Sequence, residues 1–215
     1  MLTTQRAALG STHPHTLFAM TYLARLQQDQ GKLDEAKPLM TEVLRAQRAT
    51  LGPMHPSTLV SMSNLAQLLQ DQGKLDEAKL LVVEALEAQR ATLGPKHSST
   101  LSCLTKLALL LQSQGDLEAA KPLLVEALEA HRAAHGTKHP ATLSSLQNLA
   151  VLLLAQGKVG EAEPLIAEEL EACRAFLGHA HPDTQNVYKC LLGLLSAQGK
   201  HREARKLKAA FARGK

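Results

Sequence analysis

The chain has 215 residues, of which 45% are apolar and 2% aromatic, and its formal net charge is +4. This apolar content excludes a disordered chain, and the abundance of leucine and alanine over aromatic residues predicts an all-α fold. Residues 200–215 carry +6 and residues 1–199 carry −2. The charge is therefore not the spread basic face typical of duplex binding, and we expect no nucleic-acid partner.

Cysteine spacing and apolar runs bear on the cell compartment. The three cysteines, Cys103, Cys173 and Cys190, lack CxxC spacing, which favours a reducing environment over a disulfide framework. They lie inside helical segments, so we expect buried, inert thiols. The first ten residues lack the basic start and apolar run of a signal peptide. The longest apolar run, 149–155, is too short to span a bilayer. We therefore expect a soluble, cytoplasmic chain that does not enter the membrane.

A period of 42 residues organises the whole sequence, without insertion or deletion. The histidines that recur at this spacing are His13, His55, His97, His139 and His181. The Gln-Gly pairs that recur at this spacing begin at Gln30, Gln72, Gln114, Gln156 and Gln198. We expect one array of repeats, with full repeats at 11–52, 53–94, 95–136 and 137–178.

The two ends of the array depart from the full repeat. Residues 1–10 align with the end of the repeat at 11–52, so they are expected to be the tail of a truncated preceding repeat. On this reading the chain is a fragment, or the end of a longer array. Residues 179–215 form the last expected repeat, whose final segment, 200–215, is a basic capping helix or a surface that docks an acidic partner.

The repeat at 53–94 is expected to contain two helices. Apolar residues recur at helical spacing from Leu59 to Leu69, and Gln72-Gly73 then predicts a helix stop. A second apolar periodicity runs from Leu75 to Leu86. Gly94 follows, where a residue that tolerates left-handed geometry ends the second helix. Each repeat is therefore a pair of helices joined by a tight turn.

The connector between repeats is expected to mark the start of the next helix. Pro56 fixes φ for a first helical turn, and His55 before it is placed as an N-cap that accepts from a free backbone N–H. Thr58 can add a local hydroxyl contact. In the third repeat Ser98 replaces the proline, which a helix start tolerates and a catalytic motif need not.

Enzyme and metal interpretations find little support in the sequence. Equivalent histidines of stacked repeats would lie about 10 Å apart, whereas zinc ligands lie within roughly 2 Å of the ion. His131 and His135 lie four residues apart, with Cys173 equivalent to His131, but no third ligand is implied. No P-loop, GxSxG, HExxH or GxGxxG context occurs. We expect no metal, no cofactor, no small-molecule substrate and no catalytic activity.

The repeat resembles the tetratricopeptide (TPR) family. The matching strings are LxNLAxLL, QGKLDEAxxL and the HPxTL connector, in a unit eight residues longer than the usual 34, as in kinesin light chains. The matching consensus positions in the second repeat are Leu65, Ala66, Gly73, Ala78, Ala85 and Leu86. The resemblance implies a right-handed α-α superhelix, or solenoid, whose concave groove is lined by the first helix of each repeat.

The resemblance also implies a peptide-binding groove. In similar arrays, asparagines immediately before the Leu-Ala pair hold the backbone of a ligand, and Asn64 and Asn148 match that position. Tyr22, Lys106 and Cys190 depart from it. Neighbouring groove candidates are Arg25, Gln67 and Lys189, and their excess of positive charge favours an acidic peptide of a protein partner. The chain is thus interpreted as a non-enzymatic adaptor scaffold, with Tyr22, Arg25, Asn64, Gln67, Lys106, Asn148 and Lys189 as its peptide-binding residues.

One alternative function and one unusual residue stay open at this stage. The array could instead be architectural, assembling with itself through exposed ends and holding no ligand in its groove. Glu169 is also unusual, because the equivalent positions hold Val43, Ala85, Ala127 and Phe211. A carboxylate at a packed position needs a partner or a proton, and we expect partial exposure to solvent at this site.

Overall fold

The regular secondary structure of the described residues is entirely α-helical. The computed structural model describes residue 6 and residues 9–213, and it contains no strand within them. Most of the predicted N-terminal tail, residues 1–10, lies outside the described residues. The helices are α2 (Pro14–Asp29), α3 (Leu33–Leu51), α4 (Pro56–Asp71), α5 (Leu75–Leu93), α6 (Ser98–Ser113), α7 (Leu117–His135), α8 (Pro140–Ala155), α9 (Val159–Leu177), α10 (Pro182–Ala197) and α11 (His201–Arg213). The all-α prediction is confirmed.

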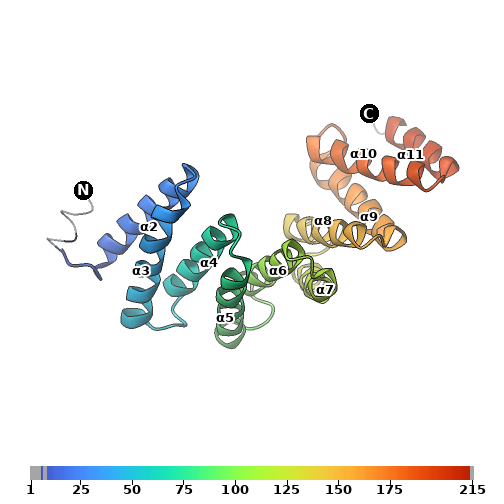
Figure 1. The fold of residues 1–215 in the computed structure, drawn as a ribbon. Coiled ribbons are helices and arrows are strands. Elements are labelled where there is room, and N and C mark those ends of the chain that lie inside the picture. The colour runs from blue at the N-terminus through green and yellow to red at the C-terminus, as the bar shows by residue number, and fades with distance from the viewer. Residues whose placement is uncertain (1–5, 7–8, 214–215) are drawn as a thin grey trace. The chain divides into compact units, whose positions relative to one another are not determined.

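The chain divides into two compact units, and each is a series of packed helices. Unit 1 spans residues 1–114 and contains α2 to α6, and unit 2 spans residues 115–215 and contains α7 to α11. Within each unit every helix packs against the next one along the chain. Figure 1 shows the resulting helical hairpins, such as α2 with α3 in unit 1 and α8 with α9 in unit 2.

A tight turn closes each hairpin. In the hairpin of α4 and α5, the Gly73 N–H donates to the carbonyl oxygen of Gln70 at 2.9 Å, and the Lys74 N–H donates to that of Leu69 at 2.8 Å. This is the Schellman arrangement, which satisfies carbonyl groups at a helix C-terminus. It requires a positive φ, and Gly73 has φ +74°. The helix stop predicted at Gln72-Gly73 is confirmed.

The longer connectors begin each first helix in the predicted manner. His55 caps α4, because its Nδ1 accepts from the Ser57 N–H at 3.2 Å, and Pro56 is the first helical residue. The same contact recurs at the four other connector histidines, including the third repeat, where Ser98 begins α6. Gly94 before this connector has φ +87° and ψ 164°, so its φ is positive as predicted but its ψ is extended.

Bonds between successive repeats join the hairpins. The Gln72 side-chain amide donates to Asp34 Oδ1 at 2.9 Å, and the equivalent Gln114 amide donates to Asp76 Oδ1 at 2.8 Å.

Small residues pack between the helices: the alanines at the repeated core positions are all buried. They are Ala24, Ala66, Ala108, Ala150, Ala36, Ala78, Ala120, Ala162 and Ala204.

Two sequence-based expectations are wrong. Glu169 on α9 is 7% exposed and therefore buried, not partly exposed. Cys190 on α10 is exposed, whereas we expected buried, inert thiols; Cys103 and Cys173 are buried. The difference at Cys190 arises because it occupies the position of Asn64 and Asn148, on the part of the first helix that is not packed in the core.

Candidate functional site

The seven predicted binding residues all lie on first helices of the repeats. Asn64 and Asn148 are half-buried, and the other five are exposed. Within the described part of the chain, neither asparagine side chain forms a hydrogen bond, so both amides remain available. Gln67 differs, because its amide donates to Asp71 Oδ1 at 3.0 Å. By helix, the residues are Tyr22 and Arg25 on α2, Asn64 and Gln67 on α4, Lys106 on α6, Asn148 on α8, and Lys189 on α10.

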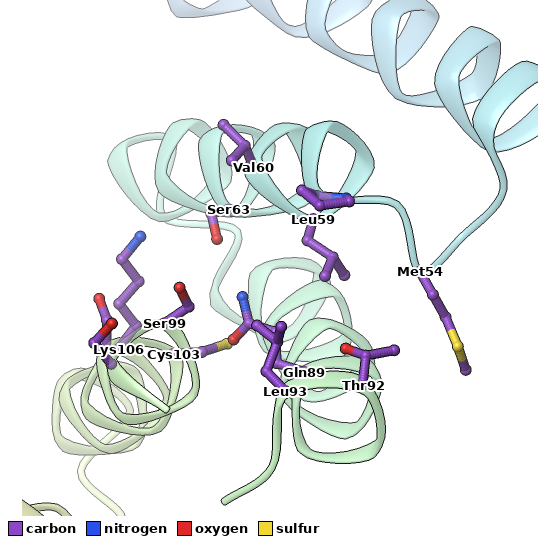
Figure 2. A pocket seen from close by; sticks show the side chains of 13 residues that line it. Met54, Leu59, Val60, Ser63, Gln89, Thr92, Leu93, Ser99, Cys103 and Lys106 are labelled. Atoms are coloured by element: carbon purple, nitrogen blue, oxygen red, sulfur yellow. The ribbon is translucent and has the colours of Figure 1, made fainter. Parts of the chain in front are cut away.

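Unit 1 contains a cavity of about 550 Å³ between α4, α5 and α6. In Figure 2, Ser63 points into it from α4, Gln89 from α5, and Lys106 from α6, whereas Met54 points away from these side chains. The lining residues are Met54, Pro56, Leu59, Val60, Ser63, Gln89, Thr92, Leu93, Ser98, Ser99, Ser102, Cys103 and Lys106. We call this the α4–α6 cavity.

The polar groups of the α4–α6 cavity are mostly donors. Lys106 contributes an ammonium group, and Ser63, Ser99 and Ser102 contribute hydroxyl groups. Gln89 is 8% exposed, and its Oε1 is buried without a hydrogen-bond partner. An unpaired buried amide oxygen costs free energy, so this wall of the cavity favours a ligand that donates a hydrogen bond. The combination suits a peptide segment, which offers backbone N–H groups and acidic side chains.

Cys103 at the base of this cavity is poorly suited to act as a nucleophile. Burial raises the pKa of its thiol, an effect that the nearby Lys106 charge partly opposes. The thiol also lies 3.5 Å from the carbonyl oxygen of Val82, to which it donates. Because the thiolate is the reactive form, a raised pKa makes the thiol inert at neutral pH.

The structure brings one of the seven predicted residues, Lys106, into the α4–α6 cavity. The lining does not include Asn64 or Gln67, and the residues that sequence reasoning missed are Ser63, Ser102 and Gln89. Ser102 lies one helical turn before Lys106 on α6, so the i, i+4 spacing could have revealed it. Gln89 belongs to the second helix of its repeat, and no sequence signal marked it.

Unit 2 has cavities at the equivalent place between α8, α9 and α10. Two adjoining cavities, of about 320 and 220 Å³, share Gln147, Glu169, Asn186 and Val187. We call them together the α8–α10 cavity. Gln147 and Asn186 are the equivalents, 84 residues on, of Ser63 and Ser102 in the α4–α6 cavity. The repeated fold thus forms the same hollow twice with different chemistry.

Acidic groups dominate the α8–α10 cavity. Burial, and secondarily the negative charge of Asp183, raise the pKa of Glu169 to about 7. Burial also raises the pKa of Cys173 to about 11, with Glu169 and Asp183 adding to the effect. No lysine or arginine lines either part of this cavity. Within residues 9–213, Glu169 forms no ion pair and no hydrogen bond.

The histidines singled out as possible metal ligands form a stack of rings. The ring centroids of His131 and His135 lie 6.3 Å apart, and those of His135 and His139 lie 4.3 Å apart. His131 Nδ1 lies 2.8 Å from Ser145 Oγ, and burial, together with the other two histidines, lowers its pKa. Among the described residues, no group of three or more histidine, cysteine or acidic side chains is placed to hold a metal ion. None of the described helices combines the length and apolar content needed to cross a bilayer.

The helical hairpins, their 42-residue period and the shared cavity position define a tandem-repeat protein of the α-helical hairpin class. The model of the MalT-like TPR region matches residues 1–138, and a tetratricopeptide repeat model matches residues 142–183. The chain belongs to the tetratricopeptide-repeat family and is of the kinesin-light-chain-like type, as the sequence predicted. Among curated proteins none matches the chain.

Solved structures with the same fold agree with this assignment. The chain is 30% identical to a Podosopora anserina protein with nearly identical TPR-like repeats, described as a kinesin light chain; the match covers 93% of this chain and 95% of that one, with a TM-score of 0.79. BtubC (BKLC) from P. vanneervenii is 21% identical over 98% of this chain and 85% of that one, with a TM-score of 0.78. A Rap protein complexed with Competence and Sporulation Factor is 12% identical over 92% of this chain and 53% of that one, with a TM-score of 0.63.

Proteins of this family generally serve as scaffolds for protein–protein interaction and are typically not enzymes.

Proposed function

We propose that this chain is a non-enzymatic adaptor that holds an extended peptide segment of a protein partner against the first helices of its repeats. The α4–α6 cavity carries this proposal, because it combines an exposed ammonium group, several serine hydroxyl groups and an unpaired buried amide oxygen. These groups match the carboxylates and backbone N–H groups of a peptide. The available amides of Asn64 and Asn148 support the same function.

The α4–α6 cavity favours an acidic side chain. Lys106 is its cation, and no carboxylate lines it. Arg25 and Lys189 are further exposed cations on first helices, which agrees with an acidic segment as the partner. The three free cysteines support a reducing, cytoplasmic compartment, where such a scaffold would meet its partner.

A peptide display selection on the intact chain tests this function. Selected peptides should be enriched in acidic residues, and Lys106→Ala should weaken their binding at least about 5-fold, which corresponds to about 1 kcal/mol. A double variant, Asn64→Ala with Asn148→Ala, should also weaken binding several-fold while helicity is kept. Lys208→Ala removes an exposed lysine of α11 and serves as the matched control.

Two results would contradict the proposal. The first is that selected peptides bind the parent, the Lys106 variant and the asparagine double variant equally well. Peptide binding would then not involve the groove. Oligomers that grow with concentration, together with no selected peptide, would favour the architectural array that assembles through its ends. Light scattering across a concentration series separates that case from a binding scaffold.

A further inference from the structure

The α8–α10 cavity holds a buried carboxyl group that no other repeat has. Glu169 is 7% exposed, and the equivalent residues Val43, Ala85, Ala127 and Phe211 are apolar and buried. Glu169, on α9, lines both parts of the cavity. A buried ionisable group without a partner is costly. Its position at the meeting point of two cavities provides the space in which a partner could bind.

The groups around Glu169 are polar or apolar, and none of them is a cation. Asp183, Gln147, Asn186 and Ser144 contribute oxygen atoms, while Phe176 and Leu177 contribute apolar surface. The adjoining part adds Val151, Leu154 and Ile166. A charged group at the end of an apolar stem fits such surroundings, because its stem packs on apolar side chains while its head is paired.

We propose that the α8–α10 cavity is a recognition site for a basic side chain, an arginine in preference to lysine, of the partner's peptide segment. Arginine carries five N–H donors in a planar fork, and this cavity offers carboxylate and amide oxygens from three helices, α8, α9 and α10, around one hollow. The exposed ring of Phe176 gives the guanidinium plane a surface to stack on. The proposal rests on the proposed function only in taking the ligand to be a peptide.

The two cavities then select opposite charges. The α4–α6 cavity has Lys106 and no carboxylate, whereas the α8–α10 cavity has Glu169 and Asp183 and no cation. A partner segment with an acidic residue for one hollow and an arginine for the other would match both. A uniformly acidic peptide would leave the Glu169 carboxyl group without a counter-charge.

Binding of a cation to Glu169 should depend on pH. With its pKa raised to about 7, Glu169 is largely protonated at pH 6 and largely ionised at pH 8. The other titratable groups around it are Cys173 on its own helix, and Asp183 and Cys190 on α10; the cavity residues of α8 are uncharged. Burial raises the pKa of both thiols, so they stay neutral in this range. The Nδ1 of His181 lies 3.6 Å from the Asp183 carboxylate, so an imidazole also lies beside this end of the cavity.

The test uses small probes and the whole chain. N-acetyl-argininamide is titrated into the protein, and side-chain and backbone NMR signals of residues on α8, α9 and α10 report binding. N-acetyl-citrullinamide is the neutral isostere of this probe, and N-acetyl-lysinamide has the same charge in a different shape. Glu169→Gln removes the charge while keeping the side-chain volume, and Glu171→Gln, exposed on the same helix, is the control.

The argininamide probe should shift signals of Gln147, Asn186 and Glu169. It should bind more tightly than the lysine probe, and the citrulline probe should not bind. Its affinity should rise about tenfold between pH 6 and pH 8 as Glu169 ionises. In Glu169→Gln the affinity should fall at least 5-fold and lose most of its pH dependence.

Equal binding of the citrulline and arginine probes, or unchanged binding by Glu169→Gln, would overturn the site. Agmatine, which has the guanidinium group but no peptide amides, tests the source of the cation: tighter binding of agmatine than of the amide probe would overturn a peptide ligand. The proposed function fails separately, if display yields no peptide. Another outcome is that display yields acidic peptides whose affinity is the same with or without an arginine and is unchanged in Glu169→Gln. That result would support the scaffold function and contradict this site.

Discussion

The Thr58 hydroxyl donates to the carbonyl oxygen of Gly52 at 2.8 Å, and this bond links the start of α4 to the end of the preceding repeat. Thr58 is fully buried, and the same bond recurs from Thr100, Thr142 and Thr184 to the glycines six residues earlier. Each bond fixes the connector that leads into a first helix. The connector is therefore held at both ends, by the histidine cap and by this threonine.

Replacing Thr58 by valine should lower the free energy of unfolding by about 1–2 kcal/mol, because the Gly52 carbonyl oxygen keeps only the longer bond from the His55 N–H, at 3.4 Å, while the side-chain volume is kept. Urea denaturation followed by circular dichroism measures the change. Thr92→Val is the control, since Thr92 bonds to the Ala88 carbonyl oxygen within its own helix. Equal losses in both variants would mean that the connector bond adds no stability of its own.

Replacing His55 by alanine should lower the free energy of unfolding by about 1 kcal/mol, as is typical for a lost N-cap. Its Nδ1 accepts from the Ser57 N–H, and asparagine can replace that acceptor. His55→Asn should therefore keep most of the stability that His55→Ala loses. Thermal denaturation of both variants checks this, and a His55→Ala chain as stable as the parent would show that water replaces the cap without cost.

Two glycines should respond in opposite directions to alanine. Gly94 has φ +87° and ψ 164°, a region that residues with a Cβ rarely adopt, so Gly94→Ala should cost about 1–3 kcal/mol. Gly193 lies inside α10, and an added Cβ there meets no atom within 4 Å. Gly193→Ala should stabilise the chain by about 0.5–1 kcal/mol. Thermal denaturation measures both, and the same sign for both would contradict the conformational argument.

Glu169→Gln should stabilise the chain at high pH. The unfolded carboxyl group ionises near pH 4.5, whereas the folded one holds its proton up to about pH 7. The stability that the protonated group contributes is therefore present at low pH and is lost as pH rises through 7. The variant should exceed the parent by about 1–3 kcal/mol at pH 8 and by less than about 1 kcal/mol at pH 5. Urea denaturation at both values, with Glu171→Gln as control, tests this; an equal gain at both would refute it.

Thiol labelling should separate the cysteines of the folded chain. Cys190 is exposed, while Cys103 and Cys173 are buried. A disulfide reagent at pH 8 should react first with the exposed thiol, although the raised pKa of Cys190 slows that reaction, and denaturant should release the other two. Cys190→Ser should abolish the fast reaction. Fast labelling that persists in this variant would mean that a buried thiol becomes accessible through local opening.

The helix ends could be predicted because the chemistry of each end is local. Gly73 and His55 act through their own backbone and immediate neighbours, so a motif in the sequence was enough to place the turn and the cap. The α4–α6 cavity could not be predicted in the same way. Its lining combines three helices, and Gln89 enters it from a helix whose outward face looks ordinary in sequence.

Glu169 marks a second limit of the sequence pattern. Its position was recognised as a packed one, but we expected solvent to stabilise the charge. In the structure α8 and α10 both pack against α9, so Glu169 is covered. Its burial raises the pKa of the carboxyl group, so the cost of burying a charge is lowered by protonation and not by contact with solvent. Periodicity gives the position of a residue in the repeat; it does not say whether an ionisable group there keeps its charge.

Because each helix packs on its successor within a unit, no segment must find a distant partner in order to fold. Even the side-chain bond from Gln28 to Asp71 spans only 43 residues. Such near-neighbour connectivity lowers the loop-closure entropy that opposes folding and favours fast assembly. It also means that a terminal hairpin can open without disrupting helices several places away, so amide hydrogens should exchange in a graded series along each unit and not all at once.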